Sequence, residues 1–209
     1  MLPLVRRAAG ALKRRPVPGC LANLWLSLRW NATVSPRAII TRPWLLTLGH
    51  GAHVGACTLH CSGDGIVIGT GSFIHDTVLI DCQQGGVTIG PQTTINTFSA
   101  IYGAGGVHIG ADCLVATGAV LVASSHRFDD PAVPIRLQGS DAKGIAIEDD
   151  VWIAAGVKVL DGVHIGRSTI VGAGAVVNRD LPSFTVAAGV PARVIRMRPG
   201  AAGSFEDVP

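Results

Sequence analysis

The chain has 209 residues, of which 27 are glycine, and only 5% are aromatic although 48% are hydrophobic. So little aromatic volume argues against a core built around large rings, and the many small residues suit short strands joined by tight corners. The net charge of +3 is too small to indicate nucleic acid as a partner, and the sequence lacks the run of about 18 uncharged apolar residues that predicts a membrane-spanning helix.

Residues 1–33 are expected to form a basic, partly helical N-terminal segment. The weak apolar stretch at residues 21–28 is interrupted by polar side chains, and no small-residue cleavage site follows it, so we do not interpret it as a signal peptide. A solvated helix packed on the main body is one reading, and contact with a membrane surface is the other. The first fifteen residues contain five cations: Arg6, Arg7, Lys13, Arg14 and Arg15.

The cysteines favour a reducing, cytoplasmic location. Their odd number, their irregular spacing and the lack of a C-x-x-C pair do not indicate a disulfide framework. The two tryptophans of the N-terminal segment, Trp25 and Trp30, leave open peripheral contact with the inner face of a membrane. The five cysteines are Cys20, Cys57, Cys61, Cys82 and Cys113.

A period of six residues governs the chain from Leu48 onward. Series with this period begin at Leu48, Ile68, Ile89 and Ile109, which lie 20, 21 and 20 residues apart. A helix cannot hold one face at a period of six, and strand alternation alone would not fix the residue type at every sixth position. The longest series is Ile147, Ile153, Val159, Ile165, Val171 and Val177.

Each hexad is interpreted as a short strand and a corner, and three hexads as one triangular coil. The aliphatic residue should point inward and stack on its counterpart in the next coil. The two or three residues beyond 18 in the earlier coils are Gly-rich and should bulge at one corner. The pattern predicts an all-β parallel β-helix over residues 34–196, followed by a tail at 197–209.

The repeat breaks once, between Leu121 and Ile147, which are 26 residues apart. The residues from about 123 to 146 include two prolines and several charges, so we expect them to leave the coil as a loop. A long loop in a rigid repeat is usually functional, and His126 lies at its start.

Three segments resemble the hexapeptide acyltransferases, and among these the sugar O-acetyltransferases. They are Ile147-Glu-Asp-Asp-Val-Trp-Ile-Ala-Ala-Gly-Val, Gly162-Val-His-Ile-Gly and Ala188-Gly-Val-Pro-Ala-Arg-Val-Ile-Arg. The segment Pro134-Ile-Arg-Leu-Gln-Gly is closer to acetyltransferases of bacterial surface-polysaccharide synthesis. The resemblance covers about residues 48–198. It implies a left-handed β-helix, a homotrimer and active sites between subunits.

The resemblance also implies catalytic roles. His126 matches the histidine that acts as general base, and imidazole titrates near the working pH. Asn96 matches an asparagine that contacts the acceptor or the intermediate, although an asparagine capping a β-helix corner is an equal alternative. The backbone N–H of Ala155 is expected to stabilise the oxyanion. His75 and Asp76 are expected to line the acceptor cleft.

Acetyl-CoA is the expected co-substrate. Its pantetheine arm should bond to backbone groups near Ala154, Ala155 and Ala173. Its phosphates require cations, for which Lys143, Arg193 and Arg196 are the candidates, unless these side chains are simply solvated.

No metal is expected, because the spacing of the histidines matches no metal-binding pattern. His108 and His164 each precede an inward isoleucine and should therefore face outward. The sequence thus favours an acetyl-CoA-dependent O-acetyltransferase of a sugar hydroxyl, acting by direct transfer in surface-polysaccharide or glycan modification. The alternatives are an acetyltransferase for an amino sugar, serine or an antibiotic, and outside this class a β-helix zinc hydratase or an assembly module.

Overall fold

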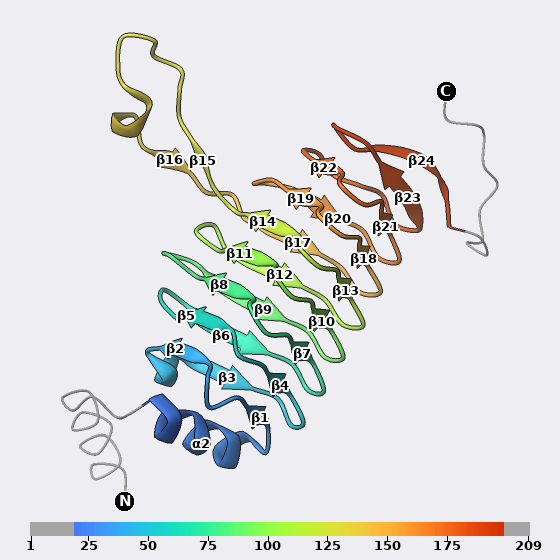
Figure 1. The fold of residues 1–209 in the computed structure, drawn as a ribbon. Helices are drawn as coiled ribbons and strands as arrows, with labels where there is room; N and C mark the ends of the chain where they lie inside the picture. The colour runs from blue at the N-terminus through green and yellow to red at the C-terminus, as the bar shows by residue number, and fades with distance from the viewer. Residues whose placement is uncertain (1–18, 199–209) are drawn as a thin grey trace, which may run out of the picture.

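The computed structural model describes residues 19–198, which wind into a parallel β-helix preceded by one helix (Figure 1). The helix, α2 (Gly19–Trp30), lies at the N-terminal end of the stack and contacts the first coil. It ends where Asn31 adopts a left-handed backbone conformation with φ of 47°. No helix among these residues has the length and hydropathy that a membrane crossing requires.

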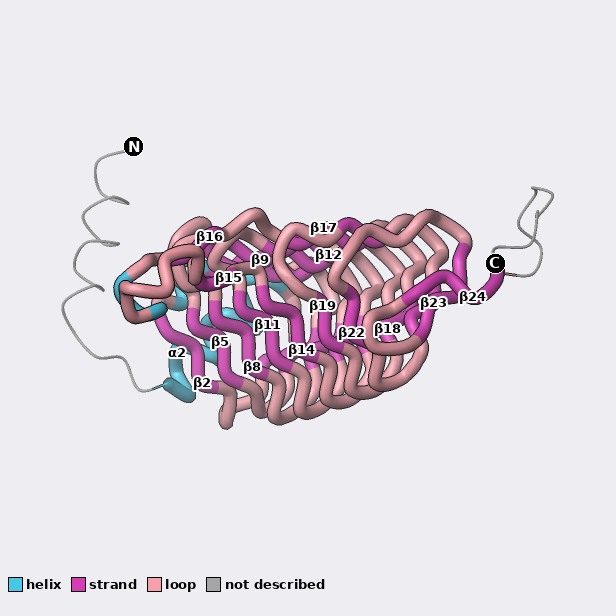
Figure 2. The backbone as a smooth tube through the Cα atoms, turned by 90° about the horizontal axis from the view of Figure 1, so that it is seen from above, coloured by secondary structure: helices cyan, strands magenta, loops and turns pink. Residues whose placement is uncertain are grey.

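Each coil contributes one strand to each of three sheets, which run along the axis of the stack (Figure 2). Sheet A contains β1 (Thr33–Val34), β4 (His53–Val54), β7 (Phe73–Ile74), β10 (Thr94–Ile95), β13 (Leu114–Val115), β18 (Trp152–Ile153), β21 (Ile170–Val171), β23 (Thr185–Ala188) and β24 (Arg193–Met197). Sheet B contains β2 (Ile39–Thr41), β5 (Thr58–His60), β8 (Leu79–Asp81), β11 (Ala100–Tyr102), β14 (Val120–Val122), β19 (Lys158–Val159) and β22 (Val176–Val177). Sheet C contains β3 (Leu46–Leu48), β6 (Gly65–Ile68), β9 (Gly86–Ile89), β12 (Val107–Ile109), β17 (Ile145–Ile147) and β20 (His164–Ile165).

The inward assignment of the hexads is confirmed. All six aliphatic residues of the series from Ile147 to Val177 are 0% exposed. Strand pairing places Val115 beside Ile153 and Ile153 beside Val171, so identical positions of successive coils stack. Burying each such side chain contributes about 1.5–3 kcal/mol, and the column as a whole holds the coils together.

Most of the A–B corners, which join a strand of sheet A to the next strand of sheet B, are tight turns whose third residue has a positive φ, and this residue is not always glycine. At one of them, Val157 N–H donates to Ala154 O at 3.4 Å and Gly156 has φ of 70°. This is the pattern of a type II turn, whose third residue needs a positive φ. Phe98 occupies the same place two coils earlier with φ of 60°.

The extra residues of the early coils bulge at one corner, as expected. They lie at the B–C corner, between β5 and β6, between β8 and β9, and between β11 and β12. The long loop leaves the stack at this same corner as a hairpin. Its base is the antiparallel pair of β15 (Ser125–His126) and β16 (Ser140–Asp141), and a 3-10 turn, η2 (Ile135–Leu137), lies near its tip (Figure 1). A second 3-10 turn, η1 (Pro43–Leu45), connects β2 to β3.

The C-terminal end of the stack differs from the hexad pattern. β24 pairs with β23 antiparallel, after the hairpin turn around Gly189. It therefore covers the edge of sheet A that a further parallel coil would otherwise occupy. The division at residues 33 and 196 stays a prediction. The five cations of the first fifteen residues, and the tail beyond residue 198, lie outside the described residues.

Candidate active site

His126 lies on β15, where the loop leaves the β-helix. Its side chain is exposed and makes no side-chain hydrogen bond within residues 19–198. Arg127 beside it is held by Asp141 on β16, with 2.7 Å between Arg127 Nε and Asp141 Oδ1. The hairpin therefore fixes the backbone of His126 and leaves both ring nitrogens available for a proton transfer.

Asn96 lies at the A–B corner, in a column with His75 one coil earlier and Ala154 two coils later. Neighbouring positions in such a column are about 4.8 Å apart, the spacing of paired strands. The half-buried Asn96 side chain donates from Nδ2 to Val115 O at 3.0 Å. This bond ties Asn96 to the next coil and leaves its side-chain oxygen unbonded within the described residues.

The backbone N–H of Ala155 has no acceptor within residues 19–198. Its position explains this, because Ala155 is the second residue of the type II turn and its N–H points away from the coil. Ala155 is exposed, Ala154 before it is buried, and Ala173 occupies the place of Ala155 in the next coil and is also exposed. The two alanines present small side chains along one edge, where an extended molecule can approach the backbone closely.

His75 and Asp76 lie one coil before Asn96 on the same edge. The Phe73 ring stacks on His53 with 4.0 Å between centroids, and the His75 ring is tilted by 44° to it with 4.5 Å between centroids. Asp76 Oδ1 accepts the N–H of Ala56 at 2.6 Å, and the second oxygen of this exposed carboxylate makes no bond within the described residues. Polar groups therefore line this edge over two coils.

The candidate CoA-binding cations fall into two places. Arg193 and Arg196 lie on β24, next to β23, and Arg193 pairs with Ala188, whose Cβ is close to Gly172 at the A–B corner. Both side chains are exposed and bond only to backbone carbonyls within the described residues. Lys143 lies at the B–C corner instead, along a groove of about 540 Å³ on sheet C.

The three sheets form the faces of a triangular prism, and the A–B and B–C corners form two separate edges of it. Asn96 and Ala155 lie on the first edge, and His126 leaves from the second. Thr117 and Ala123 are six residues apart along one face of a coil, and the extended strand β14 lies between them, so at about 3.3 Å per residue the two edges are roughly 10–20 Å apart. A single chain therefore does not bring His126 to Asn96 or Ala155.

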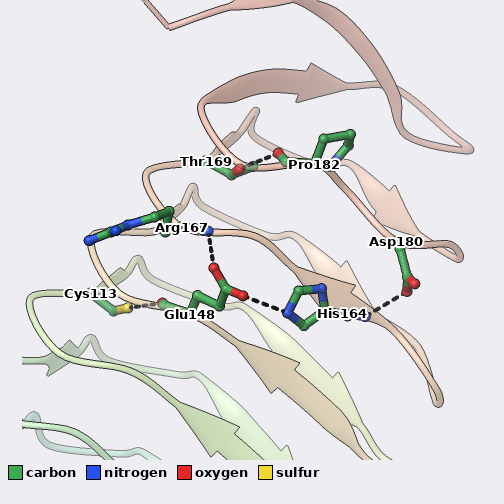
Figure 3. Close-up of polar contacts among 7 residues, drawn as sticks. All are labelled: Cys113, Glu148, His164, Arg167, Thr169, Asp180 and Pro182. Carbon is green, nitrogen blue, oxygen red and sulfur yellow. Dashed lines mark hydrogen bonds and ion pairs between the residues drawn. The ribbon is translucent and has the colours of Figure 1, made fainter. Parts of the chain in front are cut away.

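The remaining polar clusters have structural partners. His108 and His164 face outward, as predicted. In Figure 3 the His164 ring lies 3.0 Å from Glu148, which also accepts the N–H of Arg167 at 2.7 Å. Within residues 19–198 no group of three His, Cys, Asp or Glu side chains is placed to hold a metal ion.

Four of the cysteines are buried in the stack and Cys20 is exposed. Burial raises the pKa of the Cys57 and Cys61 thiols to about 12, and it also raises the pKa of Cys82 and Cys113. These four thiols stay protonated near neutral pH and are poor nucleophiles.

The resemblance implied the oxyanion role of the Ala155 N–H, and the structure adds the turn direction that leaves this N–H without an acceptor within residues 19–198. The apolar character of the loop was not predicted from the sequence: Phe128, Ile135 and Leu137 are 69%, 55% and 61% exposed. Large apolar side chains that are this exposed on one loop indicate a surface that packs against another molecule.

The comparisons with known proteins identify the family. A model of the bacterial transferase hexapeptide family (six repeats) matches residues 144–179. A hexapeptide-repeat acetyltransferase from Vibrio cholerae, solved with acetyl coenzyme A, is 31% identical with a TM-score of 0.57, over 62% of this chain and 69% of that chain. The chain therefore belongs to the hexapeptide-repeat acetyltransferase family, and its fold is the expected left-handed parallel β-helix.

Two further relatives are informative. A probable acetyltransferase of Mycobacterium tuberculosis is 30% identical over 88% of this chain, which spans only 60% of that protein's length. The polySia-specific acetyltransferase NeuO is 26% identical with a TM-score of 0.55, over 75% of this chain and 70% of that chain. The chain thus spans 60% of the length of the curated relative and 70% of NeuO.

Proposed function

We propose that the protein transfers an acetyl group from acetyl-CoA to a hydroxyl of a sugar or glycan, with His126 as the general base. The observation that carries this proposal is the His126 ring, which is exposed and makes no hydrogen bond within residues 19–198, at the base of the β15–β16 hairpin. The acetyl coenzyme A bound to the Vibrio cholerae relative supports the donor, and the glycan specificity of NeuO supports the acceptor class.

His126 accepts the proton of the acceptor hydroxyl as its oxygen attacks the thioester carbonyl. The Ala155 N–H donates to the oxyanion that develops on that carbonyl, because it points outward and none of the described residues accepts it. As the carbonyl reforms, the C–S bond breaks, and His126 returns its proton to the leaving thiolate. No acyl-enzyme is needed, since both substrates meet in one site.

The site is completed by a second copy of the chain. His126 and Ala155 lie on different edges of the prism, so the base of one copy has to meet the A–B corner of its neighbour. The exposed apolar side chains of the loop fit this arrangement, because they would be covered by the neighbouring copy. A closed trimer of such contacts gives three equivalent sites.

The acceptor is placed along the A–B edge. Asn96 has a free side-chain oxygen, and His75 and Asp76 add a ring and a carboxylate beside it. These hydrogen-bond acceptor oxygens and the imidazole ring beside them suit a molecule with several hydroxyl groups. On the same edge, Ala154, Ala155 and Ala173 leave room for the pantetheine arm, with Arg193 and Arg196 toward the phosphates. Lys143 lies at the B–C corner, so it reaches the acetyl-CoA bound at an A–B edge only from the neighbouring copy.

The test is thiol release from acetyl-CoA against a panel of sugars and glycans, with the wild type and His126→Ala side by side. We expect release that depends on the acceptor and falls by about 10²-fold or more in the variant. Arg127→Ala is the matched control, because it loosens the same hairpin without removing the base. A His126→Ala enzyme with wild-type turnover would remove the base assignment, and release only with amino sugars would make the enzyme an N-acetyltransferase.

A further inference from the structure

The helix α2 buries one polar side chain and exposes most of its large apolar ones. Its buried residues are Asn23 and Leu26, and the half-buried Ser27 lies on the same side. Its outward side has four large apolar residues at the helical spacing i, i+3, i+4 and i+7. These are Leu21, Leu24, Trp25 and Leu28, which are 54%, 55%, 46% and 77% exposed.

The polar residues on the inner side explain why the helix is held in this orientation. Asn23 Nδ2 donates to Ser35 O at 2.9 Å and to Ala38 O at 3.0 Å, and Ser27 Oγ accepts the N–H of Val34 at 3.1 Å. These bonds satisfy backbone groups of the first coil, which has no preceding coil to pair with. Leu26 packs inward beside them, whereas Leu21, Leu24 and Leu28 are left on the exposed side of the helix.

The charge around this end is uniformly positive. Residues 1–63 contain eight of the 17 Lys and Arg residues and none of the 14 Asp and Glu residues. The other 146 residues consequently have a net charge of −5. Arg29, Arg37 and Arg42 are exposed on α2 and the first coil, and the Arg29 guanidinium lies 5.1 Å from the ring centres of Trp25 and Trp30.

We propose that the outward face of α2 docks on an anionic lipid bilayer, with its long axis along the surface. An apolar stripe of leucines and one tryptophan, flanked by cations, fits the boundary between acyl chains and negatively charged headgroups. The adjacent first coil adds Ile39 and Trp44, which are 60% and 55% exposed. The proposal does not depend on the transferase activity. It places the N-terminal end of the β-helix at a membrane.

The experiment is co-sedimentation of the full chain with vesicles of phosphatidylcholine alone, and of phosphatidylcholine mixed with phosphatidylglycerol. We expect binding to the anionic vesicles that weakens as salt is raised, because part of the attraction is electrostatic. The triple variant Leu21→Ser, Leu24→Ser, Leu28→Ser should bind at least about tenfold more weakly. Its thermal melt should match the wild type, because the three side chains are exposed.

The matched control is Leu114→Ser, Leu160→Ser, Val190→Ser, which removes three exposed apolar residues that lie outside α2 and outside the loop. This control should keep wild-type vesicle binding. Absence of binding to anionic vesicles, or equal loss in the control variant, would overturn the proposal. It is also overturned if the α2 variant binds vesicles normally but changes its mass in size-exclusion chromatography with light scattering, because a second copy then covers the leucines.

Discussion

Replacement of Ile153 by Asp tests whether the column of inward residues holds the β-helix together. Ile153 is 0% exposed and lies between Val115 and Val171 of the neighbouring coils. The substitution removes apolar contacts worth about 2–5 kcal/mol, the usual cost of truncating such a residue. It also places a carboxylate where no cation or hydrogen-bond donor can reach it, at a further cost of several kcal/mol.

The summed loss is comparable to the whole stability of an ordinary domain, about 5–15 kcal/mol. In a stack where each coil contacts only its neighbours, the damage separates the coils before residue 153 from those after it. We therefore expect Ile153→Asp to give little soluble protein and no cooperative melt by circular dichroism. Ile153→Val should remain folded with a loss of about 0.5–1.5 kcal/mol.

Lys158→Asp is the control, because Lys158 lies on the next strand with its side chain outward. It introduces the same residue at the surface and should leave the melt nearly unchanged. Soluble Ile153→Asp protein that melts like the wild type would refute the inward assignment.

Two further outcomes are expected. Ala155→Pro removes the backbone N–H at a turn position that favours proline, so kcat should fall by about 10²–10³-fold with an unchanged melt. Thr117→Pro, at the equivalent turn of the preceding coil, should keep the wild-type kcat. Equal kcat in Ala155→Pro and the wild type would contradict the oxyanion role. A thiol reagent at pH 8 should modify Cys20 quickly and the other four cysteines only after unfolding, because burial keeps their thiols protonated. Two or more fast-reacting thiols in the folded protein would contradict the packing of the stack.

The hexads could be predicted because inward residues of one coil must match those of the next. That requirement repeats the residue type at a fixed distance, and no helix or isolated strand does so. The loop was predicted for the same reason, since Leu121 and Ile147 break the spacing. The handedness came from the family resemblance, because inward stacking alone is the same for either hand.

The sequence predicted a partly helical N-terminal segment, but it did not predict the contacts at either end of the stack, because the repeat no longer constrains them. At the N-terminal end, Asn23 and Ser27 face the first coil and satisfy its backbone, and Leu21, Leu24 and Leu28 stay exposed. At the C-terminal end, the reversal after Gly189 makes β24 antiparallel. In both places the backbone hydrogen bonds of a terminal coil decide the structure, and the residue pattern does not encode them.

The residues of the candidate site were predicted from the resemblance, which also implied active sites between subunits. His126 and Ala155 could be named from the resemblance, whereas the structure adds that they lie on different edges of the prism. Sequence spacing cannot give this separation, because it depends on the number of corners between the two residues.

The central claim, a site shared between His126 of one copy and the A–B corner of another, is tested most directly by mixing two inactive variants. His126→Ala and Ala155→Pro are unfolded together, refolded at equal amounts and assayed for acceptor-dependent thiol release. If each site takes one group from each of two copies, about one quarter of the sites in the mixed oligomers carry neither substitution, and about a quarter of the wild-type activity should return. Activity no higher than that of the separate variants would contradict the shared site.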